Sequence, residues 1–326
     1  MRRRDFFGLA AGLASSWPLV ARAQQPMLPV IGFLSSFTDN PDFVAAFQRG
    51  LSEVSYIAGR NVVFEYRWAA DGQYDRLPAA AADLVDRRVA VIFAGPIPAA
   101  LAAKAATATI PIVFAIGSDP VESGVVTSLN RPEGNITGVG FVTVALGAKR
   151  LELLRELVPT KMTAIALLVN PNNPNAEPQI KDTQAAAAVL GLQLNLLTAS
   201  SENDLDIAFS TLIRQRSDAL VVSADPFFLN QRDRLVGLAA HHAVPAIYIV
   251  REFAAAGGLM SYGSNFSDAH RQAGFYAGRI LKGEQPGDLP VVQSAKFEFV
   301  INLKTAKALS LEIPAKLLAL ADEAIE

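Results

Sequence analysis

Short apolar runs rich in valine and isoleucine alternate with segments of helical periodicity along most of the chain. This alternation constrains the fold more than any other feature of the sequence. Nearly continuous apolar runs are typical of strands buried on both faces of a parallel sheet. The runs form two sets of four, at 29–36, 61–69, 89–96 and 110–120, then at 164–174, 192–200, 219–227 and 244–253. The sequence therefore predicts an α/β fold with two doubly wound parallel-sheet lobes.

Three further extended segments lie at the places where the chain has to pass between the two lobes, at 135–141, 257–265 and 297–303. We expect them to form three hinge crossovers, which makes both lobes discontinuous in sequence. A helix expected at 267–282 would return the chain to the first lobe. The expected boundaries are 24–141 with 262–296 for the first lobe, and 142–261 with 297–326 for the second.

The N-terminus has the pattern of an export signal. Three arginines precede an apolar run that is shorter than the roughly 20 residues needed to span a bilayer, and Ala21-Arg22-Ala23 follows it. We therefore expect a signal peptide at 1–23 and a mature protein in the periplasm. The run Arg3-Arg4-Asp5-Phe6-Phe7 resembles a twin-arginine signal, so the choice between the Sec and the twin-arginine export routes stays open.

Several kinds of chemistry lack their usual residues. The sequence has no Gly-x-Ser-x-Gly elbow and no phosphate-binding Gly-Lys-Ser or Gly-Lys-Thr loop. With three histidines and no cysteine, it offers little for a metal site, a thiol nucleophile or a disulfide. A formal net charge of −2 does not suggest a nucleic-acid partner. We therefore expect no enzyme activity, no cofactor and no metal.

Polar side chains gather where the strands are expected to end. Ligands of open parallel sheets bind beyond the carboxyl ends of the strands, so these side chains would converge on one cleft between the lobes. The candidate ligand-binding residues are Ser35, Ser36, Phe37, Gly95, Ser118, Asp119, Asn170, Asn173, Asp225, Glu252 and Tyr262.

These residue types suit a small zwitterion. Hydroxyls and helix N-termini would bind a carboxylate. A carboxylate of Asp119, Asp225 or Glu252 would bind an ammonium, and aromatic rings would cover an apolar side chain. Each candidate also has a structural explanation. The two Asp-Pro pairs and Asn170 favour turns or caps, Glu252 is consistent with solvated surface, and the aromatic residues Phe37 and Tyr262 with core.

Three stretches resemble one known family. They are the arginine-rich start with its Ala-Arg-Ala-Gln-Gln end, the segment 98–139, and the segment 299–325. Together they resemble the ABC-transporter substrate-binding family that includes tryptophan-binding lipoproteins. The chain has Glu122 and Ser123 where members often have Gly and Ala, and it has no cysteine for a lipid anchor.

The resemblance implies a type I periplasmic binding protein, in which two lobes close over one ligand. It also implies a membrane permease and an ATPase as partners. We expect a solute-binding component of an ABC importer that takes an amino acid or a related zwitterion. An exported enzyme and a ligand-sensing protein on the same fold are the alternatives.

Overall fold

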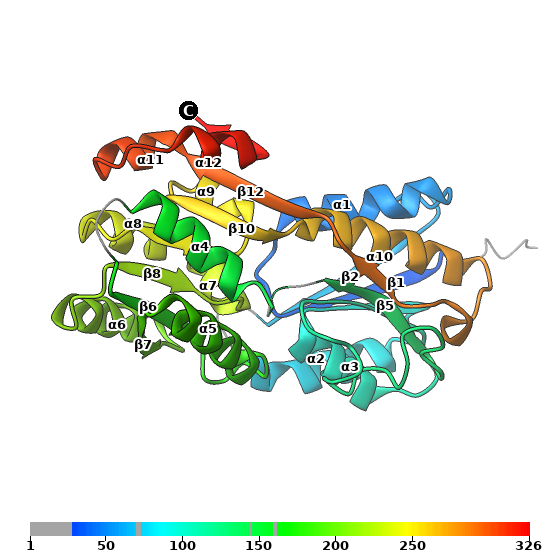
Figure 1. Cartoon of the computed structure of the whole chain (residues 1–326). Helices are drawn as coiled ribbons and strands as arrows, with labels where there is room; N and C mark the ends of the chain where they lie inside the picture. The colour runs from blue at the N-terminus through cyan, green and yellow to red at the C-terminus, as the bar shows by residue number, and fades with distance from the viewer. Residues whose placement is uncertain (1–27, 70–72, 142, 144, 159–161) are drawn as a thin grey trace, which may run out of the picture.

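The computed structural model describes residues 28–69, 73–141, 143, 145–158 and 162–326, so the expected signal peptide lies outside the described residues. It has two α/β lobes side by side, each built on one sheet (Figure 1). Two α/β lobes are the arrangement that the resemblance to type I periplasmic binding proteins implies. No helix in the described part of the chain is both long enough and apolar enough to cross a membrane.

The first lobe contains a parallel sheet of six strands in the order β11-β5-β4-β3-β1-β2. The strands are β1 (Val30–Ser35), β2 (Val63–Trp68), β3 (Val91–Gly95), β4 (Ile112–Ile116), β5 (Ile136–Phe141) and β11 (Val292–Ser294). Helices α1 (Pro41–Glu53) and α10 (Phe266–Leu281) cover one face, and α2 (Leu77–Asp86) and α3 (Ile97–Ala106) cover the other. Burial on both faces explains why these strands are continuously apolar.

The second lobe contains a sheet of seven strands in the order β13-β12-β10-β9-β8-β6-β7. Its strands are β6 (Ala164–Val169), β7 (Gln193–Thr198), β8 (Ala219–Val222), β9 (Ala246–Tyr248), β10 (Met260–Ser264), β12 (Phe297–Asn302) and β13 (Glu323–Ile325). Helices α4 (Gly147–Leu157) and α5 (Ala176–Leu190) pack on one face, and α6 (Glu202–Arg214) and α8 (Arg232–His241) on the other. This sheet is not purely parallel, because β12 runs antiparallel to β10.

Shorter elements complete the two lobes. In the first lobe, the single turns η1 and η2 precede α2 and β11. In the second, α7 and α9 follow β8 and β9, and α11 and α12 precede β13. Their bounds are η1 (Tyr74–Arg76), η2 (Pro286–Asp288), α7 (Pro226–Asn230), α9 (Arg251–Ala255), α11 (Leu303–Ala308) and α12 (Ala315–Leu320).

The chain crosses between the sheets three times, but in shorter segments than the sequence suggested. The three extended segments are themselves strands, namely β5, β10 and β12, and the chain changes lobe at their ends. The expected boundary at Tyr262 is wrong, because this residue lies inside β10, which pairs with β9 and β12 in the second sheet. Strand pairing decides this placement, and pairing partners far along the chain are not visible in local sequence.

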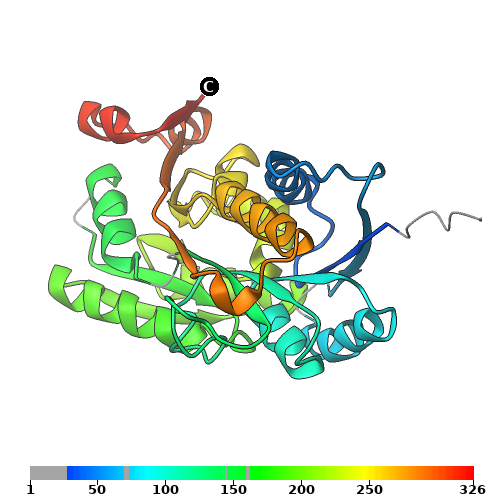
Figure 2. The ribbon, with the colours of Figure 1, turned by 90° about the vertical axis from the view of Figure 1, so that its right-hand side faces the viewer.

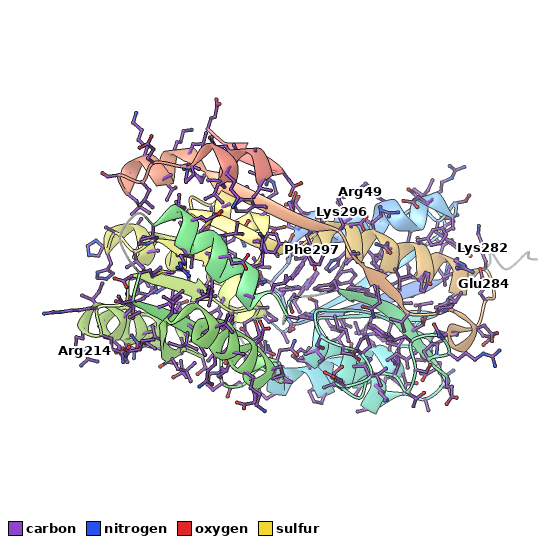
Figure 3. The ribbon with its side chains drawn as sticks, viewed as in Figure 1. Arg49, Arg214, Lys282, Glu284, Lys296 and Phe297 are labelled. Carbon is purple, nitrogen blue, oxygen red and sulfur yellow. The ribbon has the colours of Figure 1, made fainter. Side chains whose placement is uncertain are left out.

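Hydrogen bonds connect the crossovers to one another. Arg150, in the first turns of α4, donates from Nε to the carbonyl oxygen of Tyr262 at 2.9 Å and from Nη1 to that of Thr143 at 3.3 Å. The backbone N–H of Asn265 donates to the carbonyl oxygen of Lys296 at 2.9 Å. Figure 3 shows Lys296 and Phe297 near the middle of the molecule, whereas Arg214 and Lys282 lie at opposite ends.

Candidate ligand-binding site

A pocket lies between the lobes, at the carboxyl ends of the central strands. The strand order reverses at β1 and β3 in the first sheet and at β6 and β8 in the second, and such switch points are the usual ligand sites of α/β sheets. The first lobe lines the pocket with Phe37, Ile97 and Phe141 among others, and the second with Asp225 and Leu229 among others. We call this space the central pocket. Ligand held there would touch both lobes.

The central pocket is mostly apolar. Aromatic rings of Phe37 and Phe141 line it together with Phe266, which begins α10. Phe141 and Phe266 pack against each other within the first lobe, with their ring centroids 4.6 Å apart. Polar groups are few, and the described residues of the lining include no lysine, arginine or histidine. Such a surface suits an apolar side chain with a small polar head.

Asp225 is the charged residue among the described residues that line the central pocket, and its carboxylate is surrounded by donors. Oδ1 accepts hydrogen bonds from Asn170 Nδ2 at 3.1 Å and from the backbone N–H of Phe227 at 2.8 Å. Oδ2 accepts from Asn173 Nδ2 at 2.5 Å and from the Tyr74 hydroxyl at 2.9 Å. Burial raises the pKa of Asp225, and these hydrogen bonds oppose that increase because they favour the ionised form. The structure brings the candidate residues Asn170, Asn173 and Asp225 together, and both asparagines hydrogen-bond directly to the Asp225 carboxylate.

Asp225 also caps α7, as expected of an Asp-Pro turn. Asn173 holds the same region through further bonds, since its Nδ2 also reaches the carbonyl oxygen of Ala224 at 3.3 Å. Gln179 of α5 pairs with both the N–H and the carbonyl of Ala224. The loops after β6 and β8 are thus joined into one rigid wall of the central pocket.

Among the described residues, polar contacts cross from one lobe to the other at two places. The first is the bond from Tyr74 of the first lobe to Asp225 of the second. In the second, the N–H and the hydroxyl of Thr38 both donate to Asn230 Oδ1, at 3.0 and 3.1 Å. Sequence reasoning missed Tyr74, Thr38 and Asn230, because nothing in their local pattern shows that they face a distant segment.

The candidate residues at the carboxyl ends of β1 and β3 lie at the switch point of the first sheet. Ser35 Oγ accepts a hydrogen bond from the N–H of Phe37 at 3.1 Å, so it shapes the loop. The fully buried Ser36 hydroxyl has no hydrogen-bond partner in the described part of the chain. Gly95 ends β3, where an added Cβ would lie 3.0 Å from the carbonyl oxygen of Ala115. Gly95 therefore allows the two strands to approach closely.

Ser118 and Asp119 lie beside the central pocket and line a second, lateral pocket with Glu122 and other residues. The Asp119 carboxylate accepts from the N–H groups of Val121 at 2.7 Å and Glu122 at 3.0 Å. This is the turn role that an Asp-Pro pair permits. The buried hydroxyl of Ser118 has no partner among the described residues. The lateral pocket shares Gly117, Phe141 and Thr143 with the central pocket.

Glu252 and Tyr262 lie away from the central pocket. Glu252, on α9, lines a polar groove between the lobes that the start of α1 also borders. Burial raises its pKa, and the nearby Glu298 and Asp42 raise it further. The Tyr262 ring packs against Phe297 and Phe299 of β12, where it covers part of the core of the second lobe. It lies inside that lobe because β10 belongs to the second sheet.

Comparison with known proteins gives a consistent result. The family model described as ABC transporter substrate binding protein matches residues 38–325. A tyrosine-binding protein of Clostridioides difficile (strain R20291) is 27% identical over 283 residues, which are 86% of this chain and 80% of that protein.

Two solved structures with 25% identity differ in how well they superpose. A domain from Streptococcus pneumonia in complex with L-Trp has a TM-score of 0.82, with coverage of 91% of this chain and 100% of that one. The ligand-free, open structure of a substrate-binding protein with adhesive properties from Clostridium difficile has a TM-score of 0.62, with coverage of 88% and 97%. The L-Trp complex therefore superposes on this chain better than the ligand-free, open structure does. The chain belongs to the ABC transporter substrate-binding protein family.

Proposed function

We propose that this chain is the solute-binding component of an ABC importer and that it closes over a free aromatic amino acid. The observation that carries this proposal is the central pocket, which is formed by both lobes and lined by Phe37, Phe141 and Phe266. The tyrosine-binding relative and the L-Trp complex support the same ligand class. A ligand that contacts both lobes only in the closed form stabilises that form.

The polar head of the ligand would be held by neutral groups. Within the described part of the chain, no lysine, arginine or histidine lines the central pocket, so a carboxylate would be bound by hydroxyl, amide or backbone N–H donors. The candidates on the first lobe are the hydroxyls of Ser36 and Ser118, which have no hydrogen-bond partner among the described residues and adjoin the lining residues Phe37 and Gly117. Neutral donors can hold a carboxylate well where water is excluded, because hydrogen bonds to a charged group are strong there.

Thermal unfolding in the presence of amino acids tests the ligand class. We expect L-tyrosine, L-tryptophan or L-phenylalanine to stabilise the protein by about 2.7 kcal/mol at a concentration of about 100 times its Kd. Tyramine, which lacks the carboxylate, and L-leucine serve as controls and should stabilise it much less. The variant Phe37→Ala should weaken binding more than Phe64→Ala, since Phe64 lies on the edge strand β2. Failure of all three aromatic amino acids would contradict the proposal.

The transport role requires export and an intact ligand. We propose that the signal peptide at 1–23 directs the protein to the periplasm, where a permease and its ATPase would receive the ligand. N-terminal sequencing of the protein from fractionated cells tests the cleavage site. Mass spectrometry after denaturation separates a binding protein from an enzyme, because a binding protein returns its ligand chemically unchanged.

A further inference from the structure

We infer that Tyr74 is a positioning residue that holds the lobes closed by donating its hydroxyl hydrogen bond to Asp225. In this role, Asp225 accepts the hydrogen bond that connects the closed lobes, and it does not bind the ammonium group of the ligand. This inference rests on the proposed function, because it assigns the way in which the proposed binding site is kept shut. It also revises the role that the sequence suggested for Asp225.

The first argument is the number of hydrogen bonds that the Asp225 carboxylate accepts. An ionised carboxylate offers about four acceptor positions. All four are used by protein donors, which are Asn170, Asn173 and the N–H of Phe227 in the second lobe and Tyr74 in the first. An ammonium group would have to displace one of them. Tyr74 is the donor that leaves when the lobes separate, because the other three belong to the same wall as Asp225.

The second argument is that the Tyr74 phenol is suited to donate and not to ionise. Burial is the largest effect that raises the pKa of Tyr74, and the negative charge of Asp225 raises it further. The hydroxyl therefore keeps its proton over the whole physiological pH range. Tyr74 lies in η1, just before α2, so a bond from it to Asp225 connects a helix of the first lobe to the loop after β8.

The third argument is the surrounding chemistry. When the lobes open, water replaces the Tyr74 hydroxyl at the Asp225 carboxylate. The bond therefore favours the closed form by the net gain of a hydrogen bond to a charged group in a largely apolar pocket over one to water. Thr38 and Asn230 make a separate polar contact between the lobes. The closed arrangement therefore has its own polar contacts, in addition to those that a ligand would add.

The variant Tyr74→Phe tests the inference, with Tyr276→Phe as the matched control. Tyr276 donates to the carbonyl oxygen of Pro290 at 2.7 Å within the first lobe, so its hydroxyl makes no contact across the cleft. The chain has no cysteine, which allows one label in each lobe at Ala79→Cys in α2 and Glu177→Cys in α5, both exposed positions. The distance between the labels is measured with and without L-tyrosine or L-tryptophan.

We expect Tyr74→Phe to weaken amino-acid binding about tenfold, since a hydrogen bond to a charged group is worth at least roughly that factor. The loss should appear in a faster dissociation rate, and the preference between L-tyrosine and L-tryptophan should not change. The population with the short distance should decrease with ligand and without it. Tyr276→Phe should match the parent protein in every measurement.

The inference is overturned if Tyr74→Phe keeps the short-distance population of the parent protein, or if the parent never shows that population. A loss of affinity with unchanged distances would make Tyr74 a ligand contact only. If neither amino acid binds the parent protein, the proposed ligand class fails, and the ligand-free distances alone then decide the role of Tyr74.

Discussion

His270 lies buried in the first lobe, on the face of α10 that packs against α1. Its ring stacks on Phe43, with centroids 4.6 Å apart and an angle of 15° between the planes, and its Nδ1 lies 2.8 Å from the carbonyl oxygen of Phe266. Burial lowers the pKa of His270 to about 4, because the charged form loses its water. The residue is thus a neutral part of the core, although its identity alone is compatible with a ligand or proton-transfer role.

The unfolding free energy should depend on pH through His270. The unfolded chain takes up the proton near pH 6.5 and the folded chain only near pH 4, so stability is full above pH 6.5 and decreases as the pH falls toward 4. The decrease should be at most about 3 kcal/mol. Urea unfolding at pH 7 and pH 4.5 measures this decrease in the unfolding free energy. The variant His270→Gln should lack the part of the pH dependence that His270 causes. An equal slope in both proteins would contradict the assignment.

Helices α1 and α10 lie side by side over the first sheet, and glycines permit their close approach (Figures 1 and 2). A Cβ added at Gly274 would lie 1.9 Å from the carbonyl oxygen of Phe47, and one added at Gly50 would lie 1.8 Å from that of Arg271. Backbone atoms cannot move aside as a side chain can. The start of α1 is defined locally, because Asn40 accepts hydrogen bonds from the N–H groups of Asp42 and Phe43.

Replacement of Gly274 by alanine should force these two helices apart. We expect Gly274→Ala to lower the unfolding free energy by about 3 kcal/mol, the upper range for an overpacked core. Gly237, in α8, has no atom within 4 Å of an added Cβ. Gly237→Ala should therefore raise the unfolding free energy by about 0.5 kcal/mol through a smaller entropy loss on folding. Chemical denaturation of both variants measures the two effects, and the same sign for both would refute this explanation.

At the scale of the whole molecule, Arg150 connects two crossovers. It is fully buried, its Nη2 has no hydrogen-bond partner in the described part of the chain, and burial lowers its pKa to about 10. Its hydrogen bonds to the carbonyl oxygens of Thr143 and Tyr262 connect the first crossover to β10. Arg150 is therefore one of the residues that hold the crossovers in place at the hinge.

The variant Arg150→Met should leave two carbonyl oxygens near the hinge without their donor. We expect the unfolding free energy to fall by about 2–4 kcal/mol, since each unsatisfied buried acceptor costs about 1–3 kcal/mol. Arg214→Met is the matched control, because Arg214 is exposed at the end of α6 (Figure 3), where a substitution should change stability by less than about 0.5 kcal/mol. Equal stability of the two variants in urea would show that Arg150 does not support the hinge.

The sequence by itself determined the features that depend on near neighbours. The alternation of buried strands and amphipathic helices predicted two α/β lobes with parallel sheets. Local residues also define the start of α1, which Asn40 caps, and the end of α5, where Gly191 takes a left-handed conformation with φ of 66°. Each of these follows from contacts within a few residues, or from a periodicity that burial on one or both faces imposes.

Only the tertiary structure decided which polar residues meet in the cleft. Asp119 and Asp225 share the Asp-Pro motif, yet the first closes an exposed turn and the second is buried among four donors. Tyr74 faces Asp225 across the lobes, although 151 positions separate them in the sequence. Whether side chains so far apart meet depends on strand pairing and on the angle between two lobes, which residues distant in sequence set together and no local pattern encodes.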